Sequence, residues 1–182
     1  MRFVKYDYKN KISEGDYNQV FDIMSCFYGK SVTKESFDKW LENMSNTKDY
    51  YFLLCYKENT LVGFINYMYT KDGLMLSEVQ VRREYQNKGI LILMLNYMMS
   101  NCDIDKFDYV FGTINKKNLR SQSVFKHLGF KLVKDNLYKI SRDDLIKILW
   151  LRYLNYIKGP MESNYDLCIK ELKKILKKRI KL

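Results

Sequence analysis

Apolar residues follow two different spacings along the first 45 residues, and they predict one strand followed by two helices. Near-alternation of apolar and polar residues over 2–8 predicts a strand. Intervals of three and four then predict a helix capped by Asp16 and Gln19 and ended by Gly29, and a second helix after it. The apolar stripes of these helices are Tyr17, Val20, Phe21, Met24, Phe27 and Tyr28, then Phe37, Trp40, Leu41 and Met44.

Three strand-like runs come next. Residues 50–56 and 61–69 are joined by a short polar turn, and Asp72-Gly73 is typical of a tight hairpin turn into 74–81. Consecutive strands with such short connections pair antiparallel, so we expect a three-stranded antiparallel sheet.

Residues 90–140 predict a buried helix, a further strand, a short helix and a closing hairpin. Residues 90–99 are apolar nearly all round, which indicates a helix packed against the sheet, and 107–114 read as a strand. Asn118 can cap a helix over 119–128 that Gly129 ends, before a hairpin of 130–133 with 137–140. The order βααβββαβαββ predicts an α/β domain of the α+β type.

Residues 143–182 read as two amphipathic helices broken at Gly159-Pro160. We therefore divide the chain into a main domain over 1–140 and a helical basic C-terminal extension over 141–182.

Composition supports a globular protein and gives no sign of a metal site. Of 182 residues, 47% are hydrophobic and only one is proline, and no run approaches the roughly 20 apolar residues of a membrane span. The start lacks a signal peptide, so a cytoplasmic location and no membrane partner are expected. Four scattered cysteines and a single histidine, His127, argue against a metal site or a disulfide framework.

Positive charge is concentrated at the end of the chain. Residues 139–182 hold twelve Lys/Arg against five Asp/Glu, so +7 of the net +11 lies there. This distribution argues against nucleic acid as a partner of the main domain. The basic helix could bind nucleic acid, an acidic partner or a membrane surface. The simpler reading packs it on the domain or on a second subunit, as in a homodimer.

The candidate chemistry begins where the strand ending at Val81 passes into the helix near Gly89. A helix start leaves backbone N–H groups unpaired and presents the positive end of its dipole, so the turn can hold an anion such as a pyrophosphate. Gly89 permits close approach, although it could instead only relieve a tight turn. The residues of this turn are Gln86, Asn87, Lys88, Gly89, Ile90 and Leu91.

Two motifs at this separation and strand order resemble the GNAT superfamily of N-acetyltransferases over residues 1–140. Gln86 and Gly89 fit its first motif, Gln/Arg-x-x-Gly-x-Gly/Ala after a strand ending in valine. Asn118, Ser121, Gly129 and Phe130 fit its second, Asn-x-x-Ser/Ala-x-x-x-Tyr-x-x-x-Gly-Phe. The chain departs from these motifs at two positions: Leu91 replaces Gly/Ala, and Phe125 replaces the tyrosine that often protonates the departing thiolate.

The resemblance implies a largely antiparallel, splayed sheet and acetyl-CoA as cosubstrate. It implies that backbone groups of Val79 and Val81 bind the pantetheine arm, residues 86–91 bind the pyrophosphate, and Asn118, Ser121 and Phe125 border the cofactor from the opposite helix. The implied reaction is direct attack of a primary amine on the thioester in a ternary complex.

Glu78 is the candidate base, because it lies three residues before Val81 beside the expected thioester. It could equally be a strand-edge glutamate facing solvent. The departures at Leu91 and Phe125 keep a second interpretation open, a non-catalytic acyl-CoA-binding or sensor module. The acceptor stays undetermined between a small amine, an antibiotic, a polyamine, a peptide N-terminus and a protein lysine. Phe27, Tyr28 and Trp40 could line its pocket, but are more simply core.

Overall fold

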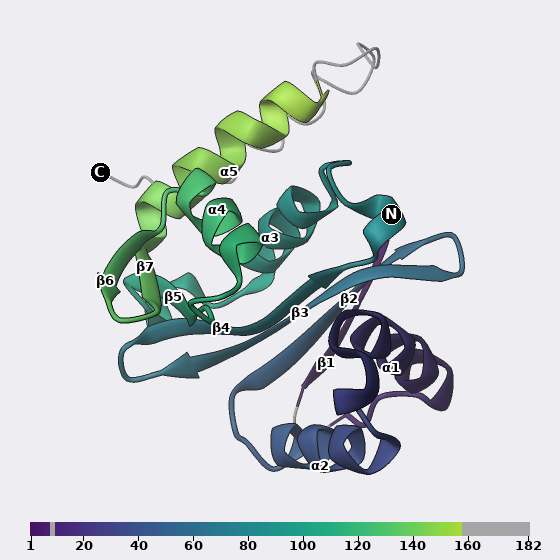
Figure 1. The fold of residues 1–182 in the computed structure, drawn as a ribbon. Coiled ribbons are helices and arrows are strands. Elements are labelled where there is room, and N and C mark those ends of the chain that lie inside the picture. The colour runs from purple at the N-terminus through teal and green to yellow at the C-terminus, as the bar shows by residue number, and fades with distance from the viewer. Residues whose placement is uncertain (8–9, 158–182) are drawn as a thin grey trace.

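The computed structural model describes residues 1–7 and 10–157 of the chain. They form the predicted order of strands and helices, including a helix at the beginning of the C-terminal region (Figure 1). The elements are β1 (Arg2–Asp7), α1 (Glu14–Tyr28), η1 (Gly29–Ser31), α2 (Lys34–Ser45), β2 (Tyr50–Lys57), β3 (Thr60–Thr70), β4 (Gly73–Val81), η2 (Arg83–Tyr85), α3 (Ile90–Asn101), η3 (Ile104–Lys106), β5 (Tyr109–Thr113), α4 (Leu119–His127), β6 (Lys131–Lys134), β7 (Leu137–Ser141) and α5 (Arg142–Ile157).

The seven strands form one mixed sheet in the order β1-β2-β3-β4-β5-β7-β6. Every neighbouring pair is antiparallel except β4 and β5, which run parallel. That parallel pair has only two partnered positions, Leu74 with Val110 and Met75 with Phe111. The predicted α+β fold with a largely antiparallel, splayed sheet is confirmed.

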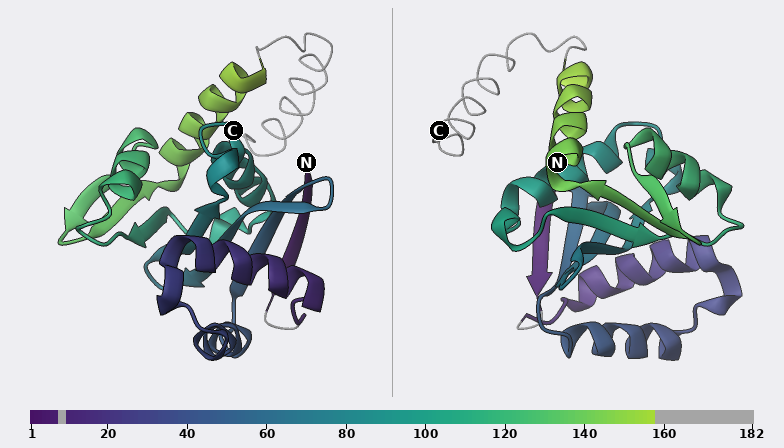
Figure 2. Two further views of the ribbon diagram at one scale, coloured as in Figure 1. Left: turned by 45° about the vertical axis from the view of Figure 1, so that its right-hand side comes forward. Right: turned by 90° about the vertical axis from the view of Figure 1, so that its left-hand side faces the viewer.

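Helices cover both faces of the sheet, and each face has its own apolar core. Helices α1 and α2 lie on one face, and α3, α4 and α5 lie on the other (Figures 1 and 2). Val20, Ile23 and Phe37 are buried against the first face, and Met94, Leu95 and Met98 against the second. The apolar run predicted for α3 is therefore explained by its burial on the sheet.

The N-cap of the first helix lies three residues before the predicted one. Ser13 is the N-cap, and its side chain accepts a hydrogen bond from the backbone N–H of Asp16 at 3.2 Å. The Asp16 carboxylate instead accepts hydrogen bonds from the hydroxyls of Tyr6 and Tyr56. The sequence pattern could not separate the two caps, because Ser and Asp are both good N-cap residues.

The hairpin between β3 and β4 turns one residue earlier than predicted. Thr70 pairs with Gly73, so Lys71 and Asp72 form the turn and Gly73 is already the first strand residue. Gly73 has φ of +134°, and a β-carbon there would lie 2.4 Å from the Tyr109 carbonyl oxygen. The glycine is thus required by the close approach of β5.

The beginning of the C-terminal region is helical, as expected, and packs on α3. Leu145 and Leu149 of α5 are buried, and the Asn96 side-chain amide lies 3.4 Å from the Leu149 carbonyl oxygen. The predicted break at Gly159-Pro160 and the second basic helix lie outside the described residues. The division at residue 140 stays a prediction. Within 1–7 and 10–157, no helix combines the length and apolar character needed to cross a membrane.

Candidate active site

The central geometric feature is the parting of β4 from β5. Their ladder ends at Met75 and Phe111, whereas β4 continues to Val81 while still paired with β3. Gly112 allows the last close contact, because a β-carbon on it would lie 3.1 Å from the Leu76 carbonyl oxygen. Beyond that point the edge of β4 that faces β5 has no ladder partner in the described part of the chain. A backbone edge of this kind can receive an extended ligand as an added strand does.

The residues of β4 beyond the ladder divide between the two faces of the sheet. Val79 and Val81 pack against the core that contains α3, whereas the side chain of Glu78 meets Tyr28 of α1. This alternation follows from the two-residue period of a strand. The backbone groups expected to bind the cosubstrate and the candidate base therefore belong to the same strand. The side chains of Val79 and Val81 lie on one face of the sheet, and that of Glu78 lies on the other.

The turn into α3 presents backbone N–H groups without a side-chain cap. Gly89 is the N-cap residue with a left-handed φ of 74°, and no side chain caps this helix start. Asn87 also has a positive φ, 60°, and the Gln86 amide donates a 2.8 Å hydrogen bond to the Val81 carbonyl that closes the turn. Lys88 is exposed beside it. Such a helix start favours a negatively charged group.

The two apolar residues of this turn point away from solvent. Ile90 is buried in the core, and Leu91 is half-buried and packs against it. Leu91 therefore contributes packing on the α3 side, and its backbone N–H remains part of the helix start.

Two arginines hold the turn before α3 onto α1. Arg82 forms a 2.6 Å ion pair with Asp22 and donates to the Leu61 carbonyl at 2.7 Å. Arg83 donates to the Cys26 carbonyl at 3.2 Å, and its guanidinium lies 5.9 Å from the centre of the Phe27 ring. These contacts tie the end of β4 to the C-terminal half of α1.

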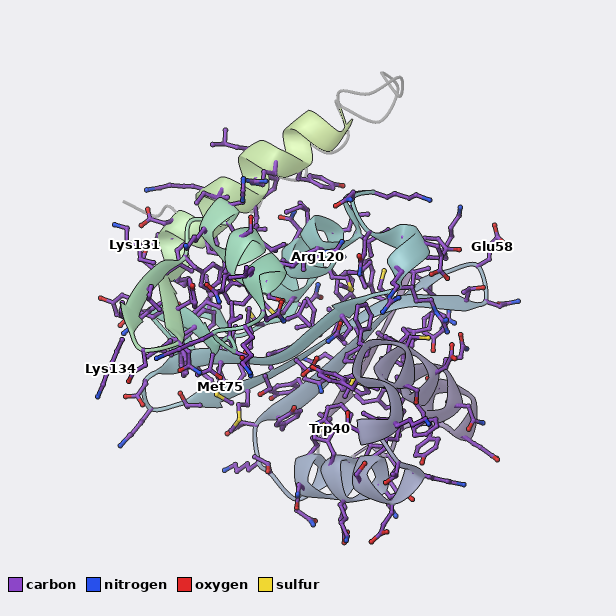
Figure 3. The ribbon with its side chains drawn as sticks, in the orientation of Figure 1. Trp40, Glu58, Met75, Arg120, Lys131 and Lys134 are labelled. Carbon is purple, nitrogen blue, oxygen red and sulfur yellow. The ribbon has the colours of Figure 1, made fainter. Side chains whose placement is uncertain are left out.

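Helix α4 brings the second motif to the other side of the gap. Asn118 caps it, with its side-chain oxygen accepting from the Ser121 N–H at 3.0 Å. The Phe125 ring packs 4.5 Å from Phe130 and 6.0 Å from Tyr138, centre to centre. Figure 3 shows Arg120 of α4 and Trp40 of α2 on opposite faces of the sheet.

Among the described residues, the rings packed against Phe125 offer no exposed hydroxyl in place of the one that it lacks. Tyr138 is the nearest ring with a hydroxyl in this packing, but it is 2% exposed and donates to the Gln122 side chain at 3.2 Å. The phenyl ring of Phe125 cannot act as an acid, and the hydroxyl of the tyrosine packed against it is already engaged.

Glu78 sits in a hydrogen-bonded cluster rather than facing solvent alone. Tyr28 donates to its Oε1 at 2.8 Å, and the Gln80 amide donates to the same oxygen. Burial raises the pKa of this carboxyl above its usual range, while the hydrogen bonds from Gln80 and Tyr28 act in the opposite direction. Glu78 combines partial burial with a second, less engaged oxygen, as a base requires.

Tyr28 and Gln80 were not predicted as members of this cluster. Tyr28 was noted for its place in an apolar stripe and as a possible lining residue of the acceptor pocket, but nothing in its spacing indicates that it meets β4. Gln80 could have been found, because residues two apart on a strand share one face with Glu78. Burial and the Glu78 charge raise the pKa of Tyr28, so its hydroxyl stays a donor.

A pocket of about 300 Å³ lies between α1 and α2 and adjoins this cluster through Tyr28. It is lined by Met24, Tyr28, Ser31, Val32, Ser36, Phe37 and Trp40. Of the three aromatic residues considered for the acceptor pocket, the half-buried Phe27 packs against the core of this face, next to the buried Phe37 of the same apolar stripes. Tyr28, at 44% exposure, and the half-buried Trp40 also face the pocket.

Comparison with known families identifies the family of this chain. The family described as acetyltransferase (GNAT) domain matches residues 10–131, which is more than half of the chain. The chain therefore belongs to the GNAT acetyltransferase family, whose enzymes use acetyl-CoA as cosubstrate. No curated protein matches the chain by sequence.

Solved structures share the fold at low sequence identity. An aminoglycoside 6'-N-acetyltransferase complexed with coenzyme A superposes with a TM-score of 0.62 at 14% identity, covering 78% of this chain and 97% of that one. PaiA N-acetyltransferase from Thermoplasma acidophilum, in complex with coenzyme A, gives 0.54 at 16%, covering 78% and 98%. The ribosomal-protein-S18-alanine N-acetyltransferase from Escherichia coli gives 0.58 at 12%, covering 77% and 94%.

Proposed function

We propose that the chain transfers an acetyl group from acetyl-CoA to a primary amine by direct attack in a ternary complex. The observation that carries this proposal is that the free edge of β4 leads straight into the uncapped start of α3, with Glu78 on the same strand. One continuous segment, 78–91, thereby offers a strand edge for an extended arm, a helix start for an anion, and a proton acceptor.

In this proposal the cosubstrate binds from the side of α3 and α4. The backbone of Val79 and Val81 pairs with the pantetheine arm, and the N–H groups of residues 86–91 hold the pyrophosphate. Asn118, Ser121 and Phe125 border the arm from α4. The fit rests on the open strand edge and on the left-handed Gly89, where a side chain would add strain and crowd the approach of a phosphate.

The amine arrives from the opposite face, where α1 and α2 lie. Its nitrogen attacks the thioester carbonyl, so a C–N bond forms, and the C–S bond then breaks. Glu78 accepts the proton that the nitrogen loses, and backbone N–H groups along the free edge of β4 are suited to stabilise the oxyanion. Because Phe125 has no hydroxyl, water protonates the released thiolate.

The raised pKa of Glu78 supports its role as base. A carboxylate with an ordinary pKa is a weak proton acceptor at neutral pH, and partial burial strengthens it. The Tyr28 and Gln80 donors hold Oε1 and leave Oε2 for the substrate. Tyr28 is a positioning residue in this arrangement.

One observation favours the second candidate, an acyl-CoA-binding module without catalysis. Phe125 is packed among aromatic rings, and the Tyr138 hydroxyl is already engaged with Gln122. This module would bind CoA without consuming it.

A thiol-release assay on the full chain separates the two candidates. Acetyl-CoA is incubated with a panel of small amines and peptides with free N-termini, and free CoA thiol is measured while binding is followed by calorimetry. Amine-dependent thiol release is expected. Binding of CoA with no release for any amine would favour the binding module.

A further inference from the structure

The pocket between α1 and α2 has a wall in common with the Glu78 cluster. Tyr28 lines the pocket, and its hydroxyl bonds Glu78. A group held in this pocket therefore lies on the same face of the sheet as the proposed base. The chemistry of the pocket walls can then indicate which amines are accepted.

The walls are apolar or hydroxylic and contain no carboxylate. Met24, Val32, Phe37 and Trp40 supply apolar surface, while Ser31, Ser36 and Tyr28 supply hydroxyls. The Trp40 ring is held in place by Phe37, at 5.4 Å, and by Phe52, at 6.1 Å. Such a lining favours the binding of an apolar substituent, because binding removes that substituent from water.

The charges around the pocket oppose a substrate with several cations. Lys30 and Lys34 flank in sequence Ser31 and Val32, which line the pocket. Glu35 is paired with Lys39 at 2.8 Å. Arg83 contacts the C-terminal end of α1, at Cys26 and Phe27. Each additional ammonium group of a polyamine or aminoglycoside would be desolvated near these cations without a carboxylate to pair with.

The volume of the pocket also favours a small substrate. About 300 Å³ is at the lower end of the range for small-molecule sites, roughly 300–1,000 Å³. It suits one ring or a short alkyl chain better than a molecule of several rings.

Resting on the proposed function, we propose that the acceptor is a small monoamine whose apolar group occupies the pocket lined by Val32 and Trp40. Its amino group then lies toward Tyr28 and Glu78. Aminoglycosides and polyamines are poor acceptors, even though an aminoglycoside acetyltransferase shares the fold.

The first test measures binding without relying on catalysis. In a full-length Trp150→Phe chain, Trp40 is the remaining tryptophan, and its fluorescence is titrated with phenethylamine, with hexylamine and with spermidine. Saturable changes are expected with the two monoamines and none with spermidine. A spermidine response equal to that of phenethylamine overturns the proposal.

The second test adds a negative charge to the pocket wall. Val32→Glu places a carboxylate in the pocket, and Asn43→Glu places one on the exposed face of α2, away from the pocket. We expect kcat/KM for phenethylamine to exceed that for spermidine or kanamycin by about tenfold or more in the native chain. Val32→Glu should lower that ratio at least about tenfold, whereas Asn43→Glu should preserve it.

The outcomes distinguish this inference from the proposed function. Monoamine binding at Trp40 without acetylation supports the pocket assignment and contradicts catalysis. Acetylation that is fastest with spermidine, kanamycin or a peptide supports catalysis and contradicts the assignment of acceptor class, as does a ratio that Val32→Glu leaves unchanged.

Discussion

The Tyr28 hydroxyl at the end of α1 donates a 2.8 Å hydrogen bond to Glu78 Oε1 in β4, fifty residues further along the chain. This bond connects the helix that borders the α1–α2 pocket to the strand that we propose holds the cosubstrate. It also lowers the pKa of Glu78 against the larger effect of burial.

Removing this bond should shift the pH dependence of the reaction. In Tyr28→Phe, Glu78 loses a donor that favours its charged form, so its pKa rises further and the acidic limb of kcat moves to higher pH. The variant should therefore be impaired more at pH 6 than at pH 9. Tyr17→Phe, which removes a hydroxyl bonded to Asp38 on α2, is the control and should keep the native profile. An unchanged limb in Tyr28→Phe would contradict the positioning role.

Replacing the base should affect turnover far more than cosubstrate binding. Glu78→Gln retains the shape of the side chain but cannot take a proton, so kcat should fall by about 10²–10⁴-fold, the usual contribution of a general base. The affinity for CoA, measured by calorimetry, should stay within about twofold of the native value, because the pyrophosphate turn is untouched. A variant that loses CoA binding and turnover together would point to a structural role.

The same substitution should stabilise the fold at neutral pH. Since burial raises the pKa of Glu78, the folded state holds the proton more tightly than the unfolded state. That contribution to stability is fully present at low pH and is lost as the pH rises through the folded pKa. Glu78→Gln should hence show a higher Tm than the native chain at pH 8, and the difference should shrink at pH 4. The exposed Glu84→Gln is the control, and it should show no such pH-dependent gain.

A side chain at Gly89 should weaken cosubstrate binding. Gly89 has φ of 74°, so Gly89→Ala costs about 1–2 kcal/mol of backbone strain and places a methyl group where we expect the pyrophosphate. Gly29→Ala is matched, because Gly29 also has a positive φ, 58°, and an added β-carbon meets nothing within 4 Å. Both variants should lose stability, but only Gly89→Ala should lose CoA affinity in calorimetry. Equal CoA affinity in the two would contradict an anion site at this turn.

The fold could be predicted from sequence because its signals are local. The spacing of apolar residues, the cap at Asn118 and the glycines at 29 and 129 each determine an element within a few residues. The misplaced start of α1 has the same origin, since Ser13 and Asp16 are equally good caps by residue type.

The site could be predicted only in part. The segment 86–91 carries its own signature of a strand end, a glycine and a helix start. The bond between Tyr28 and Glu78 depends on how α1 lies across β4, and no period in the sequence encodes that distance. The parting of β4 from β5 likewise followed from the resemblance to a family rather than from the residues themselves.

The most direct test of the central claim is the release of CoA thiol from acetyl-CoA by the full chain in the presence of phenethylamine, with the amine product identified by mass spectrometry. We predict release that requires the amine, yields the singly acetylated product and falls by about 10²-fold or more in Glu78→Gln. Bound CoA with no amine-dependent release for phenethylamine or any other amine of the panel, or release that Glu78→Gln leaves unchanged, would contradict it.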